Sequence, residues 1–262
     1  MEATFVRRYR AILWPLGVGA LLRVTWALYA ARSEPAFESS GDQYSYWALS
    51  ESIGAGHGYT IPEWVERGLD PTSYYPVGWP AMLGGVAAIR NNTPLPDDAV
   101  ASTAILQIGF GLLSILFVYL ICRRTCTDRI ATVAAWIVAL FPNLVIAVAT
   151  YSVELPFIAL TLAALTIAVT HDWSSGPPST RRLVALGAVL AAGVMVRPFA
   201  APLVAGLLIA AVVAGYSWRS VVKVVGVPVA LVALALVPWT IRNYETHDAF
   251  VPLSTNLGDT LC

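Results

Sequence analysis

Apolar stretches of about twenty residues recur along the chain, and each is long enough to cross a membrane as a helix. The uninterrupted stretches lie at 11–31, 99–122, 130–150, 152–170 and 220–240. Charged residues make up only 12% of the sequence, whereas soluble domains contain about a quarter. The sequence therefore predicts an all-α integral membrane protein.

One further apolar stretch, 183–216, is too long for a single span at a rise of about 1.5 Å per residue. It is interrupted by Arg197-Pro198, and proline biases the preceding residue away from helical geometry. We therefore expect two short spans, 181–196 and 199–216, that meet near Arg197. With the uninterrupted stretches, this division predicts about seven transmembrane helices.

The distribution of charge agrees with this count. If the N-terminus is cytoplasmic, most basic residues fall on the inner side, as the positive-inside rule requires. These residues are Arg7, Arg8, Arg10, Arg123, Arg124, Arg129, Arg181, Arg182, Arg219 and Lys223. The outer loop 32–98 and the tail 242–262 are acidic instead. We expect a multi-pass protein of the plasma (inner) membrane with this loop outside the cytoplasm.

The chain is accordingly divided into a transmembrane domain, 1–241, which includes loop 32–98, and the start of an extracytoplasmic C-terminal segment, 242–262. Within the loop, apolar residues recur every three to four positions over 42–53, which predicts a short helix. The apolar stretch 79–90 is too short to span, so we expect a juxtamembrane helix there.

Several classes of function are excluded by residue types. No basic run exceeds two residues, so no nucleic-acid partner is expected. Cys122 and Cys126 have no histidine nearby, and a zinc site needs more ligands at tighter spacing. The acidic residues of the first loop show no fixed ligand spacing. We predict neither a metal nor a cofactor.

Asp42 is the first candidate for chemistry. It begins the expected helix 42–53, where the helix dipole favours an ionised carboxylate. Such a group at a membrane surface can accept a proton from a sugar or lipid hydroxyl. The alternative is an N-cap, for which aspartate after Gly41 is a common choice. The two roles are compatible only if one carboxylate oxygen stays free.

Two arginines lie within apolar sequence, where each needs a partner, a polar cavity or access to the surface. Arg197, at the outer end of a short span, could bind a phosphate through its guanidinium group. The alternative is that its side chain extends to the membrane surface, or snorkels. For Arg23, inside the first span, we favour snorkelling.

Three other features have two interpretations each. Glu154 begins a span at its outer end and could be an N-terminal helix carboxylate with no further role, or a structural partner that orders the loop or pairs with Arg197. His57, between two glycines of a tight turn, could contact a phosphate or a sugar hydroxyl, or could be incidental. The tail after Trp239 could be an interfacial anchor or a loop that returns to a site.

Three motifs of loop 32–98 resemble the first outer loop of polyprenyl-phosphate-dependent GT-C glycosyltransferases. They are Gly41-Asp42-Gln43-Tyr44, Gly56-His57-Gly58-Tyr59 and Tyr75-Pro76-Val77-Gly78-Trp79-Pro80. The branch they resemble is related to protein O-mannosyltransferases and lipid A aminoarabinose transferases. Further segments fit in the same order: Phe141-Pro142, Ser152-Val153-Glu154-Leu155-Pro156, Val196-Arg197-Pro198, Trp239-Thr240-Ile241-Arg242-Asn243-Tyr244 and Ser254-Thr255-Asn256-Leu257-Gly258.

This resemblance implies that Asp42 is the catalytic base. It also implies a sugar donor carried on a polyprenyl phosphate and a glycan, lipid or protein acceptor outside the cytoplasm. Donor and phosphate binding is assigned to Arg197, His57, Tyr59 and Tyr75, and supporting roles are assigned to Glu154, Arg242, Asn243 and Asn256. Family members usually continue into more spans, so the resemblance implies a fragment, a truncated form or a short relative.

The favoured hypothesis is a membrane glycosyltransferase that moves one hexosyl or pentosyl group with inversion. A lipid or oligosaccharide transporter or flippase is the alternative, because broken helices and buried charge are also found there. Against it, the bundle lacks midplane acidic residues and its halves show no visible symmetry. A catalytically silent partner protein is the third possibility.

Overall fold

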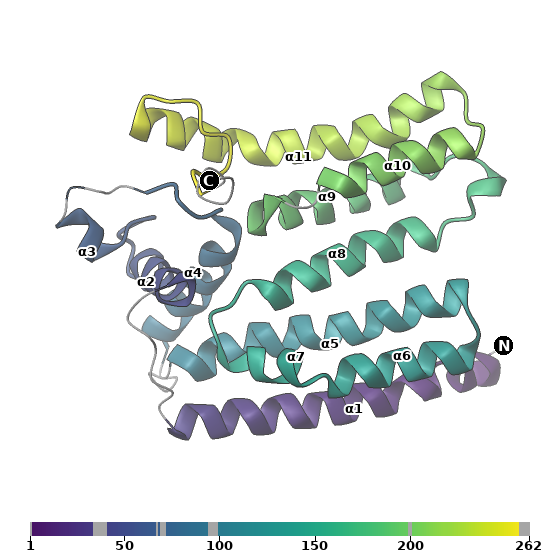
Figure 1. Ribbon diagram of the computed structural model, residues 1–262, viewed down its shortest axis with the longest axis horizontal. Helices are drawn as coiled ribbons and strands as arrows, with labels where there is room; N and C mark the ends of the chain where they lie inside the picture. The colour runs from purple at the N-terminus through teal and green to yellow at the C-terminus, as the bar shows by residue number, and fades with distance from the viewer. Residues whose placement is uncertain are drawn as a thin grey trace. The chain divides into compact units, whose positions relative to one another are not determined.

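The computed structural model describes residues 2–33, 41–66, 68, 72–93, 99–198 and 201–256. Every regular element among them is an α-helix or a short 3₁₀ turn, which confirms the all-α fold class (Figure 1). The contacts divide the chain into two compact units. Unit 1 comprises Met1–Tyr44 and Leu95–Thr170, and unit 2 comprises Ser45–Pro94 and His171–Cys262.

Unit 1 is built around helix α5. Its elements are α1 (Glu2–Ser33), α5 (Ala99–Thr125), α6 (Asp128–Leu140), α7 (Pro142–Ile146), the 3₁₀ turn η1 (Ala147–Ala149) and α8 (Glu154–Val169). Helix α5 lies between α8 on one side and the pair α1 and α6 on the other (Figure 1). Alanines at every fourth position of α6 are fully buried against Ile115 and Tyr119 of α5, because residues four apart share one helix face.

The expected span 130–150 is not one straight helix. Helix α6 ends at Leu140, and the continuation through α7 and η1 turns away by 55°. Pro142 occupies the first turn of α7, where its missing N–H costs nothing. Because the α-helical hydrogen-bond ladder stops here, the last carbonyl groups of α6 need other donors.

Arg23 supplies those donors, and the expectation that it snorkels is wrong. Its side chain is fully buried. Nη1 donates to the carbonyl oxygens of Gly19 at 3.1 Å and Ala139 at 3.0 Å, and Nη2 donates to that of Val138 at 3.3 Å. A cation suits the negative end of the α6 dipole. The guanidinium group is therefore a side-chain cap on the broken helix.

Unit 2 contains the elements of the first loop and the last three long helices. They are α2 (Asp42–Gly54), which begins in unit 1, then α3 (Pro62–Val65), α4 (Gly78–Asn91), the 3₁₀ turn η2 (Trp173–Ser175), α9 (Thr180–Val196), α10 (Ala201–Val213) and α11 (Trp218–His247). Helix α11 packs against α9 and α10, and α4 contacts α9. The short helices expected at 42–53 and 79–90 are confirmed as α2 and α4. The break at Arg197-Pro198 is also confirmed, because α9 ends at Val196 and Arg197 is extended.

Length and hydropathy identify several membrane spans. Among the described residues, Arg10–Ser33, Thr103–Thr125 and Trp218–His247 are long and apolar enough, and α6 with its bent continuation makes a fourth. Helices α8, α9 and α10 have 16, 17 and 13 residues. At about 1.5 Å per residue they fall short of a hydrocarbon core of about 30 Å. The chain is thus a multi-pass membrane protein, and the expected seven spans are not confirmed.

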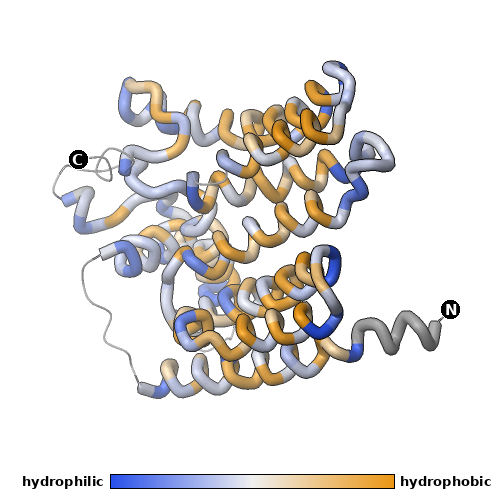
Figure 2. Tube along the Cα trace, turned by 45° about the vertical axis from the view of Figure 1, so that its right-hand side comes forward, coloured by the Kyte–Doolittle hydropathy of each residue, from blue (hydrophilic) through white to orange (hydrophobic). Residues whose placement is uncertain are grey.

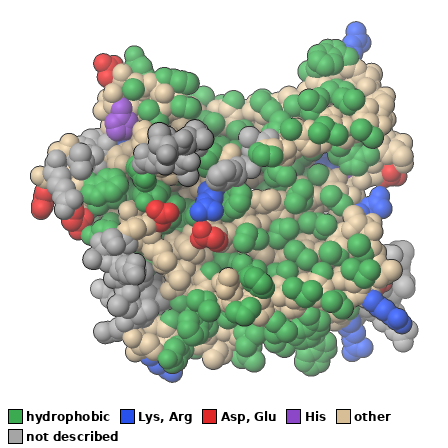
Figure 3. All heavy atoms as spheres, in the orientation of Figure 1, with side chains coloured by type: hydrophobic (Ala, Val, Ile, Leu, Met, Phe, Trp, Pro, Cys, Tyr) green, Lys and Arg blue, Asp and Glu red, His purple; other side chains and the backbone are tan. Residues whose placement is uncertain are grey.

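The surfaces of both units agree with a lipid environment. Figure 2 shows that apolar residues fill most of each long helix and that hydrophilic residues gather at the turns. Large apolar side chains such as Val213, Ile105 and Leu234 are 81%, 70% and 67% exposed. Figure 3 shows hydrophobic side chains on the surface along the helices of each unit. A soluble protein rarely exposes so much contiguous apolar surface.

Candidate active site

The end of helix α11 carries the first group of candidate residues, within unit 2. The helix continues beyond the expected boundary at 240 to His247 and is ended by Asp248, whose φ of 49° is left-handed. The chain then returns along the helix: Trp239 Nε1 donates to the carbonyl oxygen of Leu253 at 2.6 Å, and Thr240 Oγ1 donates to that of Pro252 at 3.1 Å. Of the two interpretations of the tail, the returning loop is therefore the one observed.

Arg242 connects this helix end to the first loop. Its Nη1 donates to the carbonyl oxygen of Thr72 at 2.7 Å and to Oγ of Ser73 at 3.0 Å. Its Nη2 donates to the carbonyl oxygen of Tyr59 at 3.2 Å. The guanidinium carbon lies 4.9 Å from the ring centre of Trp239, within cation–π range. One side chain thus holds two segments of the loop against α11.

Ser73 is the shared partner of three side chains. Its hydroxyl lies 2.7 Å from Asn243 Oδ1 and 2.7 Å from His247 Nε2. A hydroxyl has one proton to donate and two lone pairs. When it donates to Asn243, it accepts from Arg242 and from a protonated Nε2 of His247. Asn243 is fully buried and donates from Nδ2 to the carbonyl oxygen of Val251 at 2.9 Å.

The returning tail also pairs with the loop through its backbone. The N–H of Thr255 donates to the carbonyl oxygen of Ser73 at 2.9 Å, and that of Asn256 donates to Tyr74 at 3.3 Å. We call this assembly the loop–tail cluster: Tyr59, Thr72, Ser73, Tyr74, Tyr75, Trp239, Arg242, Asn243, His247, Thr255 and Asn256. The predicted supporting residues Arg242, Asn243 and Asn256 all belong to it.

Thr72, Ser73 and His247 were not anticipated from the sequence. The residues Trp239, Asn243 and His247 are four apart, which places them on one face of α11. This spacing is the signal that could have identified His247. Ser73 offered no such signal, because its partners lie 170 and 174 positions away in the chain.

Tyr59 and Tyr75 form the aromatic part of the loop–tail cluster. Both are buried, and the hydroxyl of Tyr59 donates to the carbonyl oxygen of Tyr75 at 2.9 Å. The ring of Tyr59 lies 4.9 Å from that of Trp239, and the ring of Tyr75 lies 4.8 Å from that of Tyr46. Burial raises the pKa of Tyr59 well above its ordinary value, and nearby Tyr46 acts in the same direction. Their donor-binding role stays a prediction.

Asp42 is the first residue of α2, as expected, and its side chain is exposed. Gly41 before it has a φ of 89°, which the chain needs to enter the helix and which glycine adopts without strain. The following turns of α2 are buried through Ser45, Tyr46 and Leu49. The helix is therefore anchored by its later turns while the carboxylate stays accessible. The role of Asp42 as a base stays a prediction.

Arg197 and Glu154 are two further predicted residues, and they belong to different units. Arg197 follows α9 in unit 2, is half-buried and donates its backbone N–H to Gly193 at 2.8 Å. Glu154 is the exposed first residue of α8 in unit 1. The loop before it is held by the fully buried Gln107, whose Nε2 donates to the carbonyl oxygens of Thr150 at 3.0 Å and Ser152 at 2.7 Å.

His57 lies in the turn after α2, between Gly56 and Gly58, whose φ angles are 81° and 84°. It is exposed and lines a cavity of about 280 Å³ together with Trp47 and Glu51. This cavity lies wholly within unit 2. Within the described part of the chain, no three His, Cys, Asp or Glu residues are grouped as a metal site.

Comparison with known families identifies a relationship. A family model described as dolichyl-phosphate-mannose-protein mannosyltransferase matches residues 83–241, well over half of the 262 residues. The matched region begins in α4 and ends in α11 before Arg242. No curated relative matches the sequence.

Solved structures of an oligosaccharyltransferase from Archaeoglobus fulgidus are similar in fold. The apo crystal structure gives a TM-score of 0.63 at 19% identity over 94% of this chain. The archaeal oligosaccharyltransferase AglB in complex with an inhibitory peptide and a dolichol-phosphate gives 0.63 at 20% identity over 93%. A form tethered to an acceptor peptide containing the NVT sequon gives 0.60 at 18% identity over 96%.

The likeness covers 31%, 30% and 32% of those three chains, so this chain spans about a third of their length. At such identities the similarity concerns the fold. It confirms the expected GT-C-like arrangement of helices.

Proposed function

Because the chain belongs to the dolichyl-phosphate-mannose-protein mannosyltransferase family, we propose that it is a membrane glycosyltransferase that uses a polyprenyl-phosphate sugar donor. The acceptor lies outside the cytoplasm, and the sugar is transferred with inversion. The match of the family model over residues 83–241 is the observation that carries this proposal. The long apolar helices support it, because a polyprenyl chain is soluble only in the bilayer.

Asp42 is the proposed catalytic base. As the acceptor hydroxyl attacks the anomeric carbon, its proton passes to the carboxylate of Asp42. The bond between the anomeric carbon and the phosphate oxygen breaks, and polyprenyl phosphate leaves. The exposed position of Asp42 at the start of α2 supports this role, because the helix dipole favours the ionised form that a base requires.

Arg197 is the proposed phosphate ligand. The leaving phosphate gains negative charge during transfer, and a fixed guanidinium group stabilises such charge. Arg197 lies in the interruption between two apolar helices, where an arginine needs a polar function. His57 is the second residue assigned to the donor by sequence, and its surroundings are considered below.

The loop–tail cluster is proposed to position the first loop. Arg242 binds the backbone of the segments that follow α2, and Asn243 accepts a hydrogen bond from the Ser73 hydroxyl, so they fix the loop that carries the proposed base without touching substrate themselves. In this proposal Asn256 acts through backbone pairing, while Tyr59 and Tyr75 pack within the cluster and keep the donor-binding role that the resemblance implies. Glu154 orders the start of α8.

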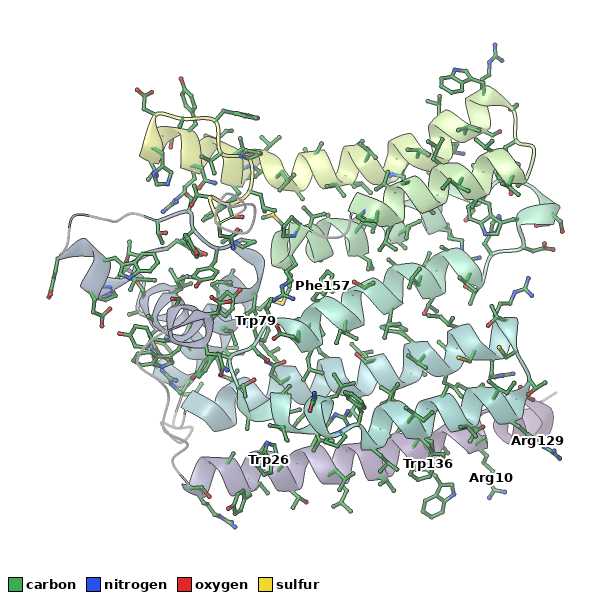
Figure 4. All side chains as sticks on the ribbon, in the orientation of Figure 1. Arg10, Trp26, Trp79, Arg129, Trp136 and Phe157 are labelled. Carbon is green, nitrogen blue, oxygen red and sulfur yellow. The ribbon has the colours of Figure 1, made fainter. Side chains whose placement is uncertain are left out.

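The sugar is proposed to be a hexose, because the description of the matching family contains mannose. The proposed orientation places the first loop outside the cytoplasm. Figure 4 supports it for unit 1: Arg10 and Arg129 lie at one end of the helices and Trp26 lies toward the other. Basic residues favour the cytoplasmic side of a membrane.

A transfer assay tests the proposal. The full chain, purified in detergent with added phospholipid, is given dolichyl-phosphate-[³H]mannose and extracts of membrane glycans and proteins as acceptors. We expect label in the acceptor fraction, little label from a dolichyl-phosphate pentose and none from a nucleotide sugar. If the labelled lipid crosses the membrane of proteoliposomes and no sugar is transferred to an acceptor, the protein is a transporter instead.

A further inference from the structure

The cavity beside His57 has a size and a lining that no assigned role explains. It measures about 280 Å³, slightly below the range of about 300–1,000 Å³ typical of drug-sized ligands. Helix α2, the turn that follows it, the start of α3 and the end of α4 form its walls. A space of this size accommodates one ring-sized polar group.

The charge of the lining disfavours an anion. Glu51 and Glu63 contribute carboxylates to the cavity, and no arginine or lysine is among the described residues that line it. Arg90, next to Asn91 in α4, is buried and forms an ion pair with Glu51, so it compensates the charge of that carboxylate. A phosphate would therefore meet no cationic ligand in the described lining, and the carboxylate of Glu63 disfavours it further. This argues against a phosphate contact for His57 and favours its other interpretation, a sugar hydroxyl.

The lining instead suits a neutral, hydroxyl-rich ring. Trp47 offers a half-buried aromatic surface, which can cover the apolar face of a pyranose. The other polar groups of the lining are the carboxylates of Glu51 and Glu63, which can accept hydrogen bonds, the imidazole of His57 and the amide of Asn91. Each sugar hydroxyl both donates and accepts, so a wall of mixed donors and acceptors is complementary to it.

The wall is held in place before any ligand arrives. Nη2 of Arg90 binds Oε2 of Glu51 and donates to Asn91 Oδ1 at 3.2 Å. Because Oδ1 is occupied, the Nδ2 group of Asn91 is the part that can donate to a ligand. The turn is closed by a 2.8 Å hydrogen bond between Ser52 Oγ and Thr60 Oγ1, and His57 N–H donates to Ser52 at 2.9 Å. Such preorganisation lowers the entropic cost of binding.

We propose that this cavity binds one uncharged pyranose of the acceptor, so that the acceptor is a glycan or a glycosylated molecule. The proposal rests on the proposed glycosyltransferase function. The sugar of the donor is the other source of a pyranose, but it is attached to a phosphate, which the described lining disfavours. Trp47, Asn91 and His57 are the specificity-determining residues.

Saturation-transfer NMR on the full chain in lipid nanodiscs tests this binding directly. The probes are methyl α-mannopyranoside, mannose 1-phosphate and ethanolamine. We expect saturation transfer to the neutral sugar and none to the sugar phosphate. Signal from the phosphate alone would assign the cavity to the donor, and signal from ethanolamine alone would make it a cation site; either result overturns the proposal.

Two neighbouring asparagines provide a matched pair of variants. Asn91→Asp removes the Nδ2 donor but keeps an oxygen for Arg90, and we expect about fivefold weaker binding of the neutral sugar. Asn92→Asp changes a residue outside the cavity, whose Nδ2 donates to the carbonyl oxygen of Ala88 at 2.8 Å, and should leave binding unchanged. Equal loss of sugar binding in both variants, or no loss in either, contradicts the proposal.

Binding and transfer are measured on the same preparation, which separates the two hypotheses. If transfer proceeds and the neutral sugar does not bind, the cavity is not an acceptor subsite while the proposed function stands. If the sugar binds at this cavity and no donor supports transfer, the proposed function fails instead.

Discussion

Nη1 of Arg23 donates to the carbonyl oxygen of Ala139 at 3.0 Å, which joins the middle of α1 to the last turn of α6. The bond supplies a donor to a helix end that Pro142 has interrupted inside the apolar region. A buried arginine is expensive in a membrane unless its charge and hydrogen bonds are satisfied. Here two carbonyl groups in the last turn of a broken helix accept hydrogen bonds from the two Nη groups of the arginine.

Arg23→Met should therefore destabilise unit 1 by about 1–3 kcal/mol, because buried carbonyl groups lose their donors. Thermal unfolding in one detergent measures the change. Arg129→Met is the control: Arg129 is exposed at the start of α6, and its loss should change stability by less than about 0.5 kcal/mol. Equal shifts in both variants would show that Arg23 caps nothing.

Gly78→Ala should weaken the packing of α4 on α9. A Cβ atom at Gly78 would lie 2.6 Å from the carbonyl oxygen of Met195, a backbone atom that cannot move aside easily. We expect a loss of about 1–3 kcal/mol. Gly85→Ala, in the same helix with open space around it, should gain about 0.5–1 kcal/mol from helix propensity. Chemical denaturation measures the free energy of unfolding of both variants. Changes of the same sign would contradict the packing of α4 on α9.

The raised pKa of Tyr59 predicts a dependence of stability on alkaline pH. The unfolded phenol releases its proton near pH 10, whereas the buried one, which donates to Tyr75, retains it to higher pH. The contribution of Tyr59 is therefore constant below about pH 10 and falls as the pH rises further. Unfolding measured from pH 8 to 11 should show this fall in the wild type and less of it in Tyr59→Phe. An identical slope in both proteins would disprove the assignment.

Arg242→Ala should loosen the first loop while α11 stays helical, since the lost bonds are those to Thr72, Ser73 and Tyr59. Hydrogen exchange should increase at 72–75 and at 251–256. Transfer should fall with it, because the loop carries the proposed base. Arg219→Ala, an exposed change at the other end of α11, is the control and should leave exchange at both segments unaltered.

Local patterns predicted much of the fold. The apolar spacing over 42–53 located α2, the short apolar stretch 79–90 located α4, and Arg197-Pro198 located the break between α9 and α10. The bend after Leu140 was missed because the apolar sequence continues unchanged through Pro142. Helix α11 also continues beyond the end of the expected span at 240, where Asn243 is buried and bonded rather than exposed to water.

The site was harder to predict because its contacts are not local. Arg242 and Asn243 were chosen from a motif, but their partners at 72–73 lie in a loop that no periodicity describes. Residue types alone left His57 between a phosphate and a sugar hydroxyl. The described lining of its cavity, which comes from separate elements, supports the sugar hydroxyl in our proposal.

Transfer by Asp42→Asn tests the central claim most directly. The substitution keeps the shape of the side chain and removes the carboxylate, and Glu66→Gln provides an exposed carboxylate of the same loop as control. With dolichyl-phosphate-[³H]mannose and a competent acceptor, the account predicts loss of at least about 100-fold in turnover for Asp42→Asn with donor binding retained, and wild-type turnover for Glu66→Gln. Turnover by Asp42→Asn equal to that of the wild type would contradict the account.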